Sequence, residues 1–318
     1  MSRGNETADT DFIFLGLSPS FRYISFLTYI IFLSYIITVS GNSILILLIG
    51  VDSRLHTPMY LLLSHLSAMD LILISTTIPK MVTNFWVQRR TISQIGCGIQ
   101  MLLYVTMTGS ECLLLTLMSY NCYVAICNPL RYPVIMNPRV CLQMTTLSWV
   151  VGFLNSLFHT VYITHFPLCD SKEIWHFFCK VSAILKLSCE DTSTYEMILF
   201  VMGIVFLLIP FGLIFTSYGI ISLSVFLMRF PEGQSKALAT CSSHLTIVSL
   251  YFGSGVFLVM IPQTQYSAQQ SQAVSLFYNT LIPMLNPIIY SLQNKEVLGA
   301  LRNMLRIGVC SQIAARRL

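Results

Sequence analysis

The hydrophobic residues of this chain form long runs that are separated by charged residues. Segments 23–51, 140–169 and 197–228 contain no Asp, Glu, Lys or Arg, and segments 55–79 and 91–130 contain one acid each. A helix needs about 20 mostly apolar residues to cross the hydrocarbon core of a bilayer. Each run is therefore long enough to form one membrane-spanning helix.

The uncharged stretch 237–294 is too long for a single crossing. Its middle, residues 262–272, begins with a proline and is rich in glutamine, which favours a turn. We therefore predict an all-α integral membrane protein, a seven-transmembrane helix bundle. The predicted helices lie at about 25–50, 57–82, 97–122, 141–163, 197–228, 237–261 and 273–292.

The composition excludes the main classes of soluble protein. Charged residues make up 10% of the chain, hydrophobic residues 55%, and the mean hydropathy is +0.72. An ordinary globular protein has about 25% charged residues, and so few charges cannot cover the surface of a soluble protein of this size. The same figures exclude intrinsic disorder, coiled coils and nucleic-acid binding.

Charge and cysteine placement indicate the orientation in the membrane. With the N-terminus outside, the inner segments hold ten Lys and Arg residues and the outer segments eight, in the sense of the positive-inside rule. Asn5-Glu6-Thr7 is a glycosylation acceptor, which functions only outside. We expect residues 1–24 to be extracellular, residues 25–292 to form the seven-transmembrane domain, and residues 293–318 to be cytoplasmic.

Four cysteines share the predicted outer side, namely Cys97, Cys169, Cys179 and Cys189. Four cysteines on an oxidising side allow three pairings, although their placement is also compatible with coincidence in a cysteine-rich chain. The other six lie in helices or on the inner side, where thiols stay reduced.

The chain has no convergent set of acids, bases or metal ligands, so we predict no enzyme activity, no metal and no cofactor. Polar residues inside the spans are costly in hydrocarbon and should face the bundle interior: Asn42, Asp70, Glu111, Asn279 and Asn286. The two acids could bind a cation or a proton. A polar network that sets helix register explains them equally well, and a transport pathway would use similar residues.

The third predicted helix has one face made of residues at three-to-four spacing, namely Cys97, Met101, Tyr104, Thr108, Glu111, Leu115, Ser119 and Cys122. The outer part of this face is apolar with an occasional hydroxyl. Such a lining suits a small, neutral, mostly hydrophobic ligand held by one or two hydrogen bonds. Plain helix packing would produce the same stripe.

Seven motifs along the chain resemble those of odorant (olfactory) receptors, a branch of the rhodopsin-like G-protein-coupled receptors. They are Gly41-Asn42, Leu55 to Tyr60 (LHTPMY), Leu66 to Asp70 (LSAMD), Met118 to Cys127 (MSYNCYVAIC), Ser217-Tyr218, Lys236 to Leu245 (KALATCSSHL) and Pro283 to Tyr290 (PMLNPIIY). The resemblance covers about residues 5–300.

The resemblance implies a plasma-membrane receptor that binds small hydrophobic odorants between helices three, five, six and seven. It also implies that the receptor then signals through a heterotrimeric G protein of the olfactory stimulatory type to adenylyl cyclase. The implied ligand-binding residues are Met101, Tyr104, Val105, Thr108, Met202, Phe206, Val256, Val259 and Tyr278. The implied G-protein-facing residues are Asn121, Cys122, Tyr123, Tyr218, Lys236 and Tyr290.

Three structural features also follow from the resemblance. It pairs Cys97 with Cys179 and Cys169 with Cys189. It places a short amphipathic helix at about 293–306 on the inner leaflet, with Lys295, Arg302 and Arg306 facing anionic membrane lipid. It implies an interior polar network of Asn42, Asp70, Glu111 and Asn286.

The chain departs from the family pattern at three places, one of which is Ala239, where the family often has serine. The family's Asp-Arg-Tyr reads Asn121-Cys122-Tyr123 here, so the arginine that helps to close the inactive bundle and later contacts the G protein is missing. Tyr251-Phe252 reverses the family's usual Phe-Tyr, which moves a hydroxyl about 100° around the helix. The leading hypothesis is an odorant receptor. The alternatives are a poorly coupling or orphan receptor, and a small-solute transporter or channel.

Overall fold

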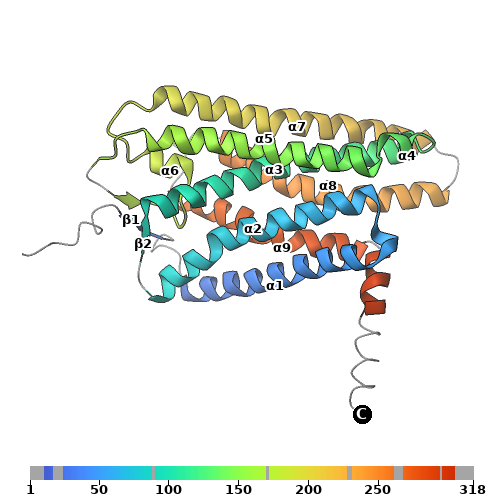
Figure 1. Ribbon diagram of the computed structural model, residues 1–318, viewed down its shortest axis with the longest axis horizontal. Coiled ribbons are helices and arrows are strands. Elements are labelled where there is room, and N and C mark those ends of the chain that lie inside the picture. The colour runs from blue at the N-terminus through green and yellow to red at the C-terminus, as the bar shows by residue number, and fades with distance from the viewer. Residues whose placement is uncertain are drawn as a thin grey trace, which may run out of the picture.

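The computed structural model describes residues 11–16, 24–87, 90–169, 172–227, 231–260, 268–293 and 296–304. Seven long helices run side by side as a bundle (Figure 1). They are α1 (Ile24–Val51), α2 (Pro58–Val87), α3 (Gln94–Cys127), α5 (Pro138–Thr164), α7 (Ser193–Leu227), α8 (Pro231–Met260) and α9 (Ala268–Gln293). All seven predicted helices are therefore present.

Length and hydropathy alone qualify five of these helices to cross a membrane: α1, α2, α3, α5 and α7. The remaining two, α8 and α9, are 30 and 26 residues long. They pack against each other, and they also contact α7, α1 and α2. The bundle thus has the seven-helix architecture that the hydrophobic pattern predicted.

Most helices extend beyond their predicted ends, because a hydrophobic run marks only the part of a helix that lies in lipid. Helix α3 begins at Gln94, where the Ser93 side chain caps it by accepting a hydrogen bond from the amide of Gly96 at 3.1 Å. Helix α5 begins at Pro138 after Asn137, which accepts a bond from the amide of Val140 at 2.9 Å. Side-chain caps of this kind satisfy the amides that have no partner within the helix.

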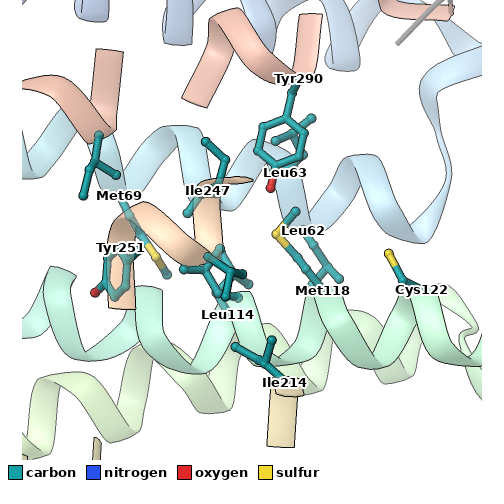
Figure 2. Packing of buried hydrophobic residues seen from close by; sticks show 14 of the residues in the cluster. Leu62, Leu63, Met69, Leu114, Met118, Cys122, Ile214, Ile247, Tyr251 and Tyr290 are labelled. Carbon is teal, nitrogen blue, oxygen red and sulfur yellow. The ribbon is translucent and has the colours of Figure 1, made fainter. Parts of the chain in front are cut away.

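The centre of the bundle is α3, which contacts α2, α5, α7 and α8. A large hydrophobic cluster fills the space around it and includes Leu114, Met118, Ile247 and Tyr290 from three helices (Figure 2). Close-packed side chains hold the helices of a membrane protein together. Lipid tails are as apolar as the side chains, so the hydrophobic effect does not drive helices to associate as it does in water.

A small three-stranded sheet lies at one end of the bundle, and the sequence analysis did not predict it. Strand β1 (Asp11–Phe14) lies between β2 (Thr91–Ser93), to which it is antiparallel, and β3 (Glu173–Ile174), to which it is parallel. Figure 1 shows β1 and β2 at the same end as the short helix α6 (Val181–Leu185). The expected N-terminal segment thus includes a strand that pairs with two later parts of the chain.

The opposite end carries η2 (Ser53–Leu55), α4 (Tyr132–Ile135) and a helical segment at 296–304 (Figure 1). Val297 and Ala300 of that segment are buried against the bundle, and Arg302 is exposed. The Tyr60 hydroxyl of α2 donates a hydrogen bond to the Glu296 carboxylate at 2.7 Å. A helical segment is therefore present within the range expected for the amphipathic helix, while Lys295 and Arg306 lie outside the described residues.

Candidate functional site

The loop between α5 and α7, which was expected to lie outside, is fixed to the bundle by covalent and hydrogen bonds. Disulfides join Cys97 to Cys179 and Cys169 to Cys189, which are the pairings that the resemblance implied. The Gln100 side chain of α3 accepts a hydrogen bond from the Cys179 amide at 2.9 Å and donates one to the Thr76 carbonyl of α2 at 2.8 Å. The loop is thus attached to two helices.

This attachment places aromatic rings of the loop against α3. The ring of Phe178 lies 4.7 Å from the ring of Tyr104, measured between centroids. His176 and Phe177 pack beside Phe178, and all three loop side chains are buried. Phe178 was not among the predicted site residues, and its only signal in the sequence is its place next to Cys179.

The predicted inward face of α3 does face the interior. Six of its eight residues are buried, and only Tyr104 and Thr108 keep partial exposure. The Thr108 hydroxyl donates to the Tyr104 carbonyl at 3.1 Å, so its proton is engaged while its oxygen can still accept. The surroundings of Tyr104 and Thr108 are therefore the part of this face that neighbouring side chains leave partly open.

Tyr251 of α8 lies one turn of α3 below this space. Its hydroxyl donates to the Thr108 carbonyl at 2.6 Å, and its ring lies 5.2 Å from the ring of Tyr278 on α9. The neighbouring Phe252 faces Phe211 of α7 at 5.8 Å. The predicted ligand set did not include Tyr251, although the reversed Tyr-Phe pair signalled an unusual hydroxyl here.

The structure divides the other predicted ligand-binding residues into two groups. Tyr104, Val256 and Tyr278 pack on the central cluster, and the Phe206 ring lies close to Gly109 of α3. Met101 and Val105 instead pack with Cys97 and Cys179 under the outer loop. Met101 is buried one turn from Tyr104 on α3, beside the disulfide of Cys97 and Cys179. Met202 is half-buried on α7, and the side chain of Val259 lies outside the described residues.

The interior polar residues link α9 to α1 and α2. The Asn286 amide donates to the Asp70 carboxylate at 2.7 Å, and the Asn42 amide donates to the Pro283 carbonyl at 3.1 Å. Glu111 is buried on α3, and one of its carboxylate oxygens has no partner among the described residues. Within the same described part, no three His, Cys, Asp or Glu side chains are grouped to hold a metal ion.

Neutral hydrogen bonds connect the helices at the inner end. The Tyr132 hydroxyl of α4 donates to the Asn121 side chain of α3 at 2.9 Å. The Tyr218 hydroxyl of α7 lies 2.6 Å from Nδ1 of His244 on α8. Cys122 is buried within the central cluster (Figure 2).

The predicted G-protein-facing residues are therefore covered in this conformation. Asn121, Cys122, Tyr218 and Tyr290 are all buried, and Tyr123 is half-buried. The side chain of Lys236 lies outside the described residues. Contact of the buried residues with a partner requires the inner end of the bundle to open.

Comparison with known proteins finds one family along nearly the whole chain. A family model described as olfactory receptor matches residues 31–307. Human olfactory receptor 2AJ1 is 48% identical over 306 residues, which is 96% of this chain and 93% of that protein. Human olfactory receptor 2M5 is 46% identical over 98% of this chain and 100% of its own length. Human olfactory receptor 2T1 is 47% identical over 94% of this chain and 81% of its own length.

Proposed function

This chain belongs to the olfactory receptor family, and from that premise we propose that its bundle binds a small, mostly hydrophobic odorant and activates a G protein of the stimulatory olfactory type. A receptor role, and not an enzymatic one, agrees with its relatives. Neither the transporter nor the poorly coupling receptor is favoured by the relatives that the chain matches.

One observation carries the proposed ligand site. Tyr104 and Thr108 are partly exposed on a helix face whose other predicted residues are buried, and the aromatic ring of Phe178 lies beside Tyr104. The neighbours of Tyr104 are mostly aromatic, and the hydroxyl groups of Thr108 and Tyr251 lie close by. Such a site suits a neutral organic molecule that is oriented by one or two hydrogen bonds.

The hydrogen bond from Tyr251 would couple ligand binding at this site to a movement at the inner end of the bundle. Tyr251 binds the Thr108 carbonyl directly below the proposed ligand, and His244 lies seven residues earlier on the same helix, about two turns away. A ligand that displaces Tyr251 would move α8 relative to α3. The Tyr218 to His244 bond would then break and open the inner end.

The disulfides of the outer loop support an orientation with the N-terminus outside the cell. Disulfides persist on the oxidising side of a membrane, so residues 1–24 would be extracellular and residues 293–318 cytoplasmic, at the plasma membrane. Asn5, the proposed glycosylation site, lies outside the described residues. The helix at 296–304 would lie on the inner leaflet, with Arg302 near anionic lipid.

The ligand site is tested with Tyr104→Ala and Thr108→Val in cells that report cyclic AMP, using an odorant panel and receptors matched for surface level. Loss of an apolar or polar contact is worth about 1–3 kcal/mol, so we expect the potency of responsive odorants to fall roughly tenfold or more. Ile99→Ala is the control, because Ile99 is 53% exposed on α3. Unchanged potency in both site variants would contradict the proposed pocket.

A further inference from the structure

A groove of about 730 Å³ follows the outer half of α5 on the lipid-facing surface. One end is apolar and is formed by side chains from Leu154 to Val161. The other end carries Tyr162, His165 and Glu190, and Glu190 is the one acidic side chain in the lining. The groove is separate from the proposed odorant site, which lies on the inward face of α3.

The groove has the length of one membrane leaflet. Leu154 and His165 are eleven residues apart, which corresponds to about 16 Å along a helix. The hydrocarbon core is about 30 Å thick, so the groove extends from the bilayer midplane to the headgroup level. Its apolar end therefore faces acyl chains, and its polar end faces headgroups.

The wall at the polar end is rigid and aromatic. The rings of Tyr162 and Tyr195 are stacked, with centroids 4.5 Å apart and planes inclined by 8°. Phe166 lies 5.6 Å from Tyr162 and 5.9 Å from Tyr195. The Tyr195 hydroxyl is 2.8 Å from Nδ1 of His159, which fixes the cluster from behind. These rings are in place before any ligand arrives.

Glu190 adds a negative charge beside these rings. It follows Cys189, whose disulfide to Cys169 fixes this part of the loop. In the described part of the chain the only ion pair joins Arg54 to Asp52, so the Glu190 carboxylate has no cationic partner there. A carboxylate next to aromatic faces is the chemistry that recognises a quaternary ammonium group.

We propose that this groove binds a choline phospholipid of the outer leaflet. Its acyl chain lies along Leu154 to Val161, and its quaternary ammonium group contacts the Tyr162 and Phe166 rings and the Glu190 carboxylate. The choice of leaflet rests on the proposed orientation of the receptor. The binding itself requires neither an odorant nor a G protein, so it is tested independently of the proposed function.

The test uses the full-length receptor in lipid nanodiscs that contain a photoactivatable phosphatidylcholine, with the adduct located by mass spectrometry. We expect labelling within residues 154–166 that excess phosphatidylcholine suppresses more strongly than phosphatidylethanolamine does. Glu190→Gln should weaken the competition by phosphatidylcholine roughly three- to tenfold, the scale of a lost contact with a choline group. Glu173→Gln is the matched control, since it removes an exposed acid from the outer sheet.

A second pair of variants tests whether filling the groove, without a change in charge, prevents the labelling. Val161→Trp should abolish the labelling, whereas Val150→Trp should preserve it, because both valines are similarly exposed on α5 and only Val161 lines the groove. Equal suppression by both phospholipids would overturn the proposal. It would also be overturned by labelling that only a sterol suppresses, or by cross-links between two receptor copies through this face.

Discussion

His176 is a histidine held neutral by its surroundings. It is 3% exposed, its ring lies 4.6 Å from both Phe177 and Phe178, and neither ring nitrogen has a hydrogen-bond partner among the described residues. Burial holds the pKa of His176 well below its usual value of 6.5, and the positive charge of Lys180 lowers that pKa further. A proton on this ring therefore opposes the packed position of the loop.

This environment predicts that acid destabilises the loop. As the pH falls below 6.5, His176 takes up a proton in the unfolded state but not in the folded state. The free energy of unfolding therefore decreases as the pH is lowered, until the pH reaches the lowered pKa of the folded state. At about pH 5 the loss amounts to at most about 2 kcal/mol for one group. His176→Phe should show a smaller drop in melting temperature between about pH 7.5 and pH 5, measured in purified receptor.

The control for this measurement is His56→Phe, because His56 is exposed at the other end of the molecule. That variant should lose as much thermal stability on acidification as the parent receptor does. A His176→Phe variant that is equally acid-sensitive would show that other groups cause the loss.

At the scale of elements, α3 and α5 pack with their backbones close together. A Cβ atom added to Gly152 would meet the Ser110 hydroxyl, the Thr106 carbonyl at 2.8 Å and the Ser110 amide at 2.9 Å. The Ser156 hydroxyl donates to the Leu102 carbonyl of α3 at 2.6 Å. Small residues therefore let the two backbones approach, which is how helices associate where water is absent.

Gly152→Ala should force α3 and α5 apart, because two of the three nearest atoms belong to the α3 backbone and cannot rotate away. We expect a destabilisation of about 1–3 kcal/mol, as for other overpacked sites. The thermal stability of purified receptor measures it. Gly212→Ala is the matched control, since a Cβ there meets nothing within 4 Å, and an equal loss in both variants would contradict this account.

The helices could be predicted from the sequence because each leaves a signal within its own residues, a run of apolar side chains long enough to cross lipid. The strands could not, since β3 is only two residues long and its partner in β1 is about 160 positions away. The same limit applies to the site. The spacing along α3 predicted Tyr104 and Thr108, whereas Phe178 reaches the site from a distant loop.

At the scale of the whole molecule, the closed inner end is held by uncharged groups. Tyr132 binds Asn121, Tyr218 binds His244, and the Cys127 thiol lies 3.2 Å from the Ser224 hydroxyl of α7. Neutral hydrogen bonds contribute about 0.5–1.5 kcal/mol each. The bundle can thus stay closed although Asn121 and Cys122 replace the acid and arginine of the family pattern.

In the family pattern, the acid and arginine that this chain lacks help to close the bundle, and the arginine also contacts the G protein. Asn121→Asp combined with Cys122→Arg restores a guanidinium group at the place that opens toward the partner. We expect severalfold higher odorant-evoked cyclic AMP at matched surface expression. Ala125→Arg is the control, because it adds an arginine to the exposed side of the same helix end. No gain in the double variant would show that the present residues already suffice for coupling.

Strand β1 also constrains the order in which the receptor can assemble. It precedes α1 in the chain, yet its two pairing partners are residues 91–93 and 173–174. The first of these follows two crossings and the second follows four. Strand β1 therefore lacks its second partner until four crossings have been synthesised, and the sheet is completed only after α5.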